Sequence, residues 1–124
     1  MNLLIVDDEA DVKTLFLQRF RREIRNGLFT LSFAYSGEEA LTFLSQHAQE
    51  AVLILSDINM PGMSGLELLR QIRSKNSEPP PIVMMITAYG DKESYEQAMR
   101  LGANDFLNKP LDFNSLKQKL VALV

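Results

Sequence analysis

The sequence contains no cysteine and only one histidine, His47. The absence of cysteine excludes thiol catalysis, disulfide bonds and cysteine-ligated metal sites. A lone histidine cannot supply a two-histidine metal site or a histidine relay. A chain without cysteine fits a reducing compartment, and the expected location is cytoplasmic.

Long apolar runs are also missing. No run approaches the roughly 18 residues of a membrane-spanning helix. The first apolar run, within NLLIVDDE at residues 2–9, is too short for a signal peptide and ends in acidic residues. Excess positive charge is absent too, because the net charge is −3. We therefore expect neither a membrane nor a nucleic acid as a direct partner of this domain.

The length and composition of the chain are typical of one soluble domain. The chain has 124 residues, of which 46% are hydrophobic and 23% charged. This length suits a single domain with a real core. We expect residues 1–124 to form that domain, either alone or as the N-terminal part of a longer protein.

Short apolar runs alternate five times with amphipathic stretches. Phe16, Phe20 and Ile24 recur every fourth residue, as in a helix. Ser36 followed by Glu39 has the spacing of a capping box, which predicts a helix start at residue 36. The expected strands span residues 2–6, 28–34, 52–56, 82–86 and 105–108. The other expected helices span residues 11–25, 65–76, 91–101 and 112–124.

Five strands that alternate with five helices predict an α/β fold of (βα)₅ type. The uniformly apolar runs VLIL and IVMMI indicate a parallel sheet that is covered on both faces. We expect a doubly wound, flavodoxin-like sheet with strand order 2-1-3-4-5. In such sheets, ligands bind beyond the carboxyl ends of the strands.

Polar residues with useful chemistry follow those strand ends. Asp7 and Asp8 follow the first strand, Asp57 the third, Thr87 the fourth and Lys109 the fifth. Clustered carboxylates repel unless a cation joins them or a pKa rises. Carboxylates without histidine or cysteine favour Mg²⁺, or Mn²⁺ in its place. A hydroxyl and an ammonium group beside them suit a phosphoryl group.

Four motifs stand at these strand ends: VDDE at 6–9, SDINMPGMSG at 56–65, ITA at 86–88 and NKP at 108–110. Together they resemble the receiver domain of two-component response regulators. The resemblance covers nearly the whole chain, and the motifs stand in the order of the family.

The resemblance implies a role for each motif residue. Asp57 is the expected phosphoacceptor. Asp8 and Asp57 bind Mg²⁺ through their carboxylates, Asn59 through its backbone carbonyl, and Asp7 acts through bound water.

The remaining roles concern the response to phosphorylation. Thr87 and Lys109 contact the phosphoryl oxygens, and the Lys109–Pro110 bond is expected to be cis. Thr87 and Phe106 form the expected switch. Phe106 has no hydroxyl, so this switch would depend on packing.

The resemblance also implies partners. A sensor histidine kinase or a histidine phosphotransfer protein supplies the phosphoryl group. The face formed by residues 91–101, 105–108 and 112–124 passes the signal to an output domain or target protein, or forms a homodimer. The domain is not expected to be an enzyme beyond phosphorylation and dephosphorylation of its own Asp57.

Two other classes of protein are compatible with parts of this pattern. Phosphatases and phosphotransferases of the haloacid dehalogenase type also use a strand-end aspartate, then Thr or Ser, then Lys. They usually carry a second aspartate two residues after the nucleophile, where this chain has Asn59. A pure interaction module with a degenerate site is the other alternative, and the complete set of site residues argues against it.

Overall fold

A computed structural model describes residues 1–47, 50, 52–76, 79–88 and 90–123. It contains one five-stranded sheet in which all neighbouring strands are parallel. The strand order is β2-β1-β3-β4-β5, which confirms the predicted doubly wound fold. The strands are β1 (Asn2–Val6), β2 (Thr30–Ala34), β3 (Val52–Asp57), β4 (Ile82–Thr87) and β5 (Asp105–Asn108).

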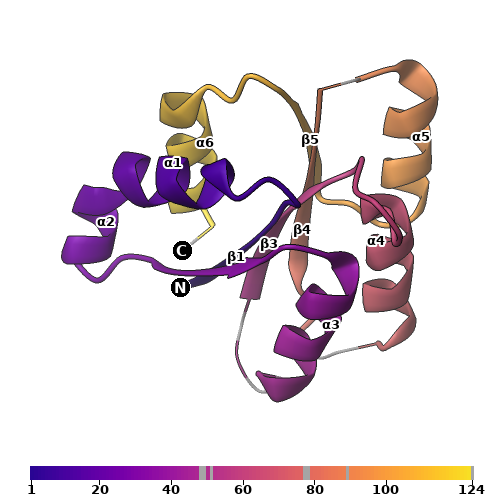
Figure 1. Ribbon diagram of the computed structural model, residues 1–124, viewed down its shortest axis with the longest axis horizontal. Coiled ribbons are helices and arrows are strands. Elements are labelled where there is room, and N and C mark those ends of the chain that lie inside the picture. The colour runs from indigo at the N-terminus through magenta and orange to yellow at the C-terminus, as the bar shows by residue number, and fades with distance from the viewer. Residues whose placement is uncertain (48–49, 51, 77–78, 89, 124) are drawn as a thin grey trace.

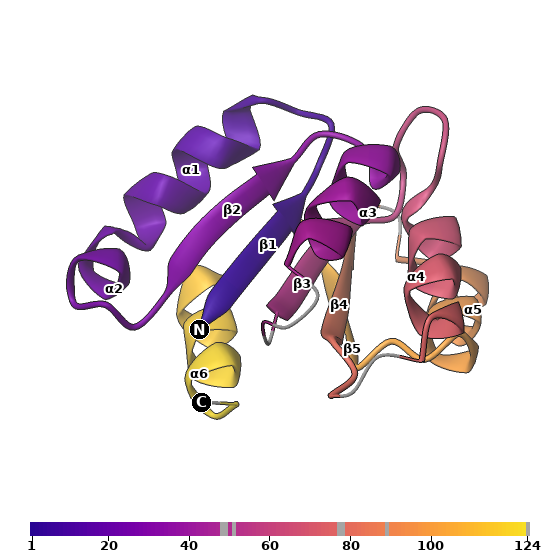
Figure 2. The same cartoon turned by 90° about the horizontal axis from the view of Figure 1, so that it is seen from below.

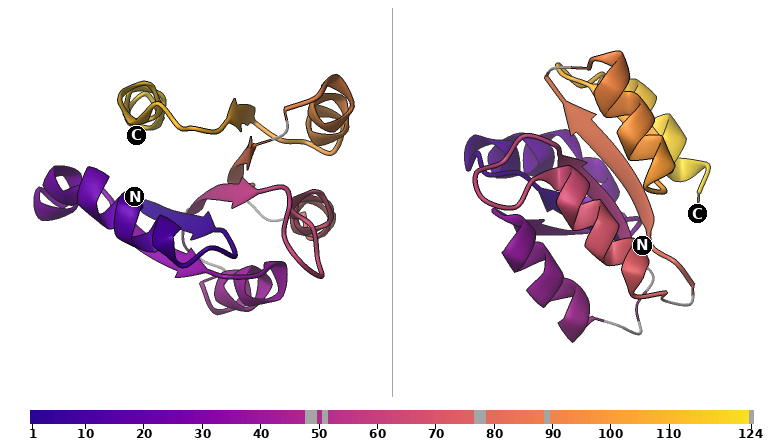
Figure 3. Two further views of the ribbon diagram at one scale, coloured as in Figure 1. Left: turned by 45° about the horizontal axis from the view of Figure 1, so that its top comes forward. Right: turned by 90° about the vertical axis from the view of Figure 1, so that its right-hand side faces the viewer.

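Helices cover both faces of the sheet, so the molecule has three layers (Figures 1 and 2). One face carries α1 (Asp11–Arg19), α2 (Arg21–Arg25) and α6 (Phe113–Val121). The other carries α3 (Gly37–Gln46), α4 (Gly65–Ser74) and α5 (Lys92–Arg100). Figure 3 shows the two helical layers edge-on, with the sheet between them.

Two clusters of buried side chains join these layers. One contains Phe16, Phe20 and Leu116 and lies under α1 and α6. The other contains Leu68 and Ile72 of α4 and lies on the opposite face. Burial on both faces explains why β3 and β4 are apolar until their carboxyl-terminal residues.

Side-chain caps place four of the helix starts. Ser36, Ser64, Asp91 and Asp112 each accept a hydrogen bond from a backbone N–H of the first turn. The expected capping box at Ser36 is only half formed. The Glu39 N–H donates to Ser36 Oγ at 3.0 Å, but the Glu39 carboxylate accepts from the N–H of Tyr35 instead of Ser36.

The helix predicted for residues 11–25 is divided at Phe20, whose φ and ψ are −102° and 13°. The Phe20 N–H still donates to the Phe16 carbonyl at 2.9 Å, so the division is a local distortion at one residue. Phe20 is fully buried, and the Glu23 carbonyl accepts the N–H of Leu28 at 2.9 Å. Since that N–H is used in the connection, β2 begins at Thr30 and not at residue 28.

The helix predicted for residues 65–76 ends two residues early, at Ser74. Asn76 has a φ of 48°, a left-handed conformation that a right-handed helix cannot include. Gly102 after α5 has a φ of 99°, the positive φ that commonly ends a helix at a glycine. Within the described residues, every helix is too short or too polar to cross a membrane.

Candidate functional site

The carboxyl ends of β1, β3, β4 and β5 bring the predicted site residues to one rim of the sheet. Asp57 and Thr87 are the last residues of β3 and β4. Asp7 follows β1, and its N–H donates to the Ala34 carbonyl of β2 at 3.1 Å. Lys109 follows β5, and its N–H donates to the Thr87 carbonyl at 2.8 Å. Backbone hydrogen bonds therefore hold the site residues in place.

Three carboxylates form the centre of the rim. Oxygens of Asp7, Asp8 and Asp57 all lie within 4.8 Å of one another. Asp7 and Asp57 are each 7% exposed, whereas Asp8 is exposed. Repulsion between such close carboxylates is only weakly screened where they are buried. The cluster therefore requires a compensating cation.

Lys109 provides part of that compensation. Its Nζ lies 3.2 Å from Asp7 Oδ2 and 3.5 Å from Asp57 Oδ2. Burial by itself would lower the pKa of Lys109, but the negative charges of Asp7 and Asp57 outweigh it and raise the pKa. Lys109 is therefore charged at neutral pH. Its ammonium group is shared by Asp7, which follows β1, and Asp57, which ends β3.

The negative charge of Asp57, the candidate phosphoacceptor, remains unfavourable despite the nearby Lys109. Burial raises the pKa of Asp57, and the charge of Asp7 raises it further. Lys109 and a hydrogen bond from the Asn59 N–H to Asp57 Oδ1, at 3.3 Å, act in the opposite direction but do not cancel the rise. The site thus favours added positive charge next to Asp57.

The donor set fits a hard divalent cation. It consists of three carboxylates, with Asp8 open to solvent, and the described residues near it include no sulfur or imidazole ligand. Mg²⁺ is commonly held by one or two carboxylates while several waters remain bound. One exposed and two buried carboxylates match that requirement.

Thr87 and Asn59 lie close together at the same rim. Thr87 is 0% exposed. Asn59 lies in the loop after β3, and its side-chain amide donates from Nδ2 to Thr87 Oγ1 at 3.2 Å. Sequence reasoning did not find this contact, because residues 59 and 87 are brought together only by the pairing of β3 with β4.

The loop between β3 and α4 is shaped by two glycines. Gly62 has a φ of 73°, which L side chains rarely adopt. Gly65 packs so closely against the backbone that a Cβ there would collide with the carbonyl oxygen of Asp57. On the far side of the site, the Lys109–Pro110 peptide bond is cis, as the resemblance implies.

Phe106 lies on β5, away from the carboxylates. Its side chain is half-buried, packs against the cluster under α4 and meets the Tyr95 ring edge-on at a centroid distance of 5.5 Å. Tyr95 is 48% exposed on α5. Phe106 therefore connects the core to an exposed side chain.

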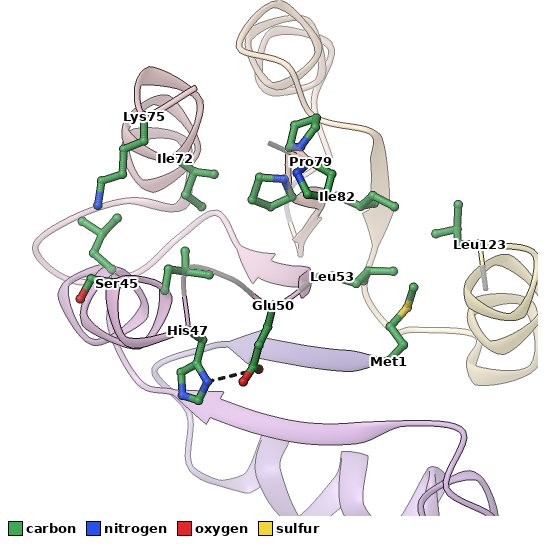
Figure 4. A pocket seen from close by; sticks show the side chains of 14 residues that line it. Met1, Ser45, His47, Glu50, Leu53, Ile72, Lys75, Pro79, Ile82 and Leu123 are labelled. Atoms are coloured by element: carbon green, nitrogen blue, oxygen red, sulfur yellow. Dashed lines mark ion pairs between the residues drawn. The ribbon is translucent and has the colours of Figure 1, made fainter. Parts of the chain in front are cut away.

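Two hollows lie at opposite ends of the sheet. One begins at the rim and continues between α1 and the segment that leads into α6; it is lined by Asp57, Lys109, Val12, Leu15, Arg19 and Leu111 among others. The other, shown in Figure 4, lies at the amino ends of β3 and β4. His47 and Glu50 form an ion-pair contact of 3.2 Å there, and the rest of the lining is mainly apolar. The carboxylate cluster places the functional site at the first hollow.

Comparison with known proteins agrees with this geometry. The family model described as "Response regulator receiver domain" matches residues 3–121. Chemotaxis protein CheY1 of Helicobacter pylori is 36% identical over 125 residues, which cover 97% of this chain and 94% of that protein. The crystal structure of a response regulator receiver protein from Pseudomonas putida superposes with a TM-score of 0.82 at 30% identity, covering 98% of this chain and 95% of that one.

Other relatives are much longer than this chain. It matches the transcriptional regulatory protein ZraR of Salmonella typhimurium with 33% identity over 120 residues, but these span only 25% of that protein. It spans 52% of the two-component response regulator PhoP of Pseudomonas aeruginosa. The receiver fold is thus shared by relatives of very different length.

The chain belongs to the response regulator receiver family. Its role is that of the receiver in two-component signal transduction, and the matches do not support the haloacid dehalogenase alternative.

Proposed function

We propose that Asp57 accepts a phosphoryl group from a phosphohistidine on a sensor kinase or a phosphotransfer protein. The observation that carries the proposal is the convergence of Asp7, Asp8 and Lys109 on the carboxylate of Asp57. Asp57 is the last residue of β3, which lies between β1 and β4 near the middle of the rim. Residues 1–124 would act as one receiver domain.

The transfer is a displacement at phosphorus. An Asp57 carboxylate oxygen attacks the phosphorus atom, and a P–O bond forms while the P–N bond to the imidazole breaks. The electron pair of that bond stays on the imidazole nitrogen, which takes up a proton. Attack by water on the same phosphorus later releases inorganic phosphate and restores the carboxylate, so the domain turns over no separate substrate.

The acidic cluster would hold Mg²⁺, or Mn²⁺, which supplies charge neutralisation for the transferred phosphoryl oxygens. Asp8 and Asp57 would be carboxylate ligands, the Asn59 carbonyl a backbone ligand, and Asp7 would act through water. The raised pKa of Asp57 supports this assignment, since burial and the charge of Asp7 both make the Asp57 carboxylate unfavourable without a nearby cation.

Lys109 and Thr87 would contact the phosphoryl oxygens. The Lys109 ammonium already lies 3.5 Å from Asp57 Oδ2 and carries the charge that a phosphoryl group attracts. Thr87 offers a hydroxyl at the neighbouring strand end, where a charge-assisted hydrogen bond to a phosphoryl oxygen can form.

The signal would leave through the face of α5, β5 and α6. Tyr95 and Met99 are exposed on α5, and Phe106 connects Tyr95 to the core. Thr87 and Phe106 would form the switch that changes this face. Its partner would be an output domain, a target protein or a second copy of the chain.

Incubation with acetyl phosphate and Mg²⁺, followed by intact-protein mass spectrometry, tests the proposal. The wild-type protein should gain one phosphoryl group, and Asp57→Asn should gain none. Asp105→Asn is the matched control, because Asp105 is a strand carboxylate that pairs with Lys119 at 2.8 Å outside the site; it should be labelled normally. A chelator of divalent ions should suppress labelling. Labelling of Asp57→Asn would contradict the assignment.

A further inference from the structure

Asn59 touches two of the groups that a phosphoryl group would meet. Its backbone N–H donates to Asp57 Oδ1 at 3.3 Å, and its side-chain Nδ2 donates to Thr87 Oγ1 at 3.2 Å. The first bond belongs to the main chain and survives any substitution except proline. The second belongs to the side chain, so the two effects can be separated by mutation.

The direction of the side-chain bond matters for the chemistry of Thr87. A hydroxyl has one proton to donate and two lone pairs that can accept. The amide of Asn59 donates to a lone pair of Oγ1, so this contact does not use the hydroxyl proton. A hydroxyl that accepts a hydrogen bond is also polarised into a better donor, since chained hydrogen bonds strengthen one another.

The backbone around Asn59 holds the amide in place. The N–H of Ile58 donates to the Ile86 carbonyl of β4 at 2.9 Å, and the Ile58 carbonyl accepts from the Gly65 N–H at 2.8 Å. The residue before Asn59 is therefore fixed to the same strand that presents Thr87. The Asn59 side chain is exposed, but it extends from backbone that follows a residue hydrogen-bonded to β4.

We propose that Asn59 is a positioning residue for Thr87: its amide orients the hydroxyl so that the proton is donated to an oxygen of the phosphoryl group on Asp57. This inference rests on the proposed phosphorylation of Asp57 and adds a residue to it. In this proposal the side-chain amide of Asn59 does not contact the phosphoryl group. It acts only through the hydroxyl of Thr87.

A double-mutant cycle tests the proposal, with beryllofluoride and Mg²⁺ as the probe for the phosphorylated state. Binding is followed by amide resonances of Thr87 and Lys109 in nuclear magnetic resonance spectra. Asn59→Leu keeps the approximate size of the side chain but removes the donor, and it should weaken binding roughly threefold to tenfold, as expected for one neutral hydrogen bond. In the Thr87→Val background, the same substitution should change binding by less than about twofold, because no hydroxyl is left to orient.

The outcomes separate this inference from the proposed function. Failure of the wild-type protein to bind beryllofluoride would contradict the proposed function itself. Normal wild-type binding with an equal loss in both backgrounds would show that Asn59 acts independently of Thr87, and tighter binding by Asn59→Leu would show that the amide holds the hydroxyl back. Either result would overturn the inference alone.

A second measurement needs neither metal nor phosphoryl analogue. Three-bond couplings to the Thr87 methyl group report the χ1 rotamer of the free protein. Wild-type Thr87 should occupy one rotamer, and Asn59→Leu should populate a second. An unchanged rotamer in the variant would contradict orientation of the hydroxyl by Asn59.

Discussion

At the scale of single residues, the rim is a balance between burial and charge. Asp7 and Asp57 are nearly inaccessible to solvent, and Lys109 compensates both of them. The pKa of Asp57 nevertheless stays above the ordinary value of 3.8. The buried Asp57 carboxylate therefore lowers the stability of the unphosphorylated protein. A carboxylate in such a perturbed environment is a candidate to react with an electrophilic phosphorus atom.

That raised pKa predicts how stability depends on pH. The folded protein binds the Asp57 proton more tightly than the unfolded chain, so the free energy of unfolding falls as pH rises from 3.8 through the raised pKa and stays lower above it. Asp57→Asn lacks this penalty. In urea denaturation without divalent ions, the variant should be more stable than wild type at neutral pH, and the difference should shrink as pH falls toward 3.8.

Asp8→Asn is the control for this pH prediction, because Asp8 belongs to the same cluster but is exposed. It should raise stability less than Asp57→Asn does. Equal effects of the two substitutions would assign the penalty to repulsion within the cluster and not to burial of Asp57.

At the scale of elements, the β3–α4 connection determines how closely α4 approaches the site. Gly65 is the first residue of α4, and it lies against the backbone of Asp57 and Ile58. The same glycine donates its N–H to the Ile58 carbonyl at 2.8 Å. The start of α4 is therefore in direct backbone contact with Asp57, the proposed phosphoacceptor.

Gly65→Ala should destabilise the protein by about 1–3 kcal/mol, because the added methyl group would displace backbone that cannot move freely. Urea denaturation measures the loss. Gly37→Ala is a matched control, since Gly37 also follows a serine N-cap at the start of a helix. A Cβ at Gly37 would meet the flexible side chain of Met63, with Sδ at 2.6 Å, and should cost less. Equal losses would refute the role of backbone contact at Gly65.

The break between α1 and α2 is a second feature at this scale. Three phenylalanines, Phe16, Phe20 and Phe113, pack together with centroid distances between 5.2 and 6.2 Å. Lys117 of α6 reaches Glu23 of α2 at 3.2 Å, so the short α2 is joined to α6. The helical periodicity of the sequence continues through this region, and the helix is divided only by the conformation of Phe20.

At the scale of the whole molecule, the site and the proposed output face lie on different parts of β4 and β5. Thr87 is at the end of β4, whereas Phe106 pairs with Met85, two residues earlier along that strand. Movement of Thr87 toward a phosphoryl group would therefore act near the space that Phe106 occupies. Any change at Phe106 would reach the surface through Tyr95.

Aromatic resonances recorded with and without beryllofluoride and Mg²⁺ test this switch. Phe106 should change its rotamer, and Tyr95 should shift with it, because the two rings are in contact. Phe16 is the internal control, since it is buried on the opposite face of the sheet and stacks on Phe20. Identical Phe106 rotamers in both states would exclude a switch at this residue.

The sequence by itself predicted the carboxyl ends of β3 and β4 to within one residue, because apolar runs are local signals. From those ends, the doubly wound fold and the meeting of Asp57 with Asp7, Asp8, Thr87 and Lys109 could be predicted. Local signals were weaker at element ends, as the early end of α4 shows.

Only the tertiary structure decided the contacts between side chains of different strands. The preference of Lys109 for Asp7, the Asn59–Thr87 hydrogen bond and the approach of Gly65 to Asp57 depend on distances across the sheet. Patterns along the chain specify which groups reach the rim, whereas packing specifies which of them touch.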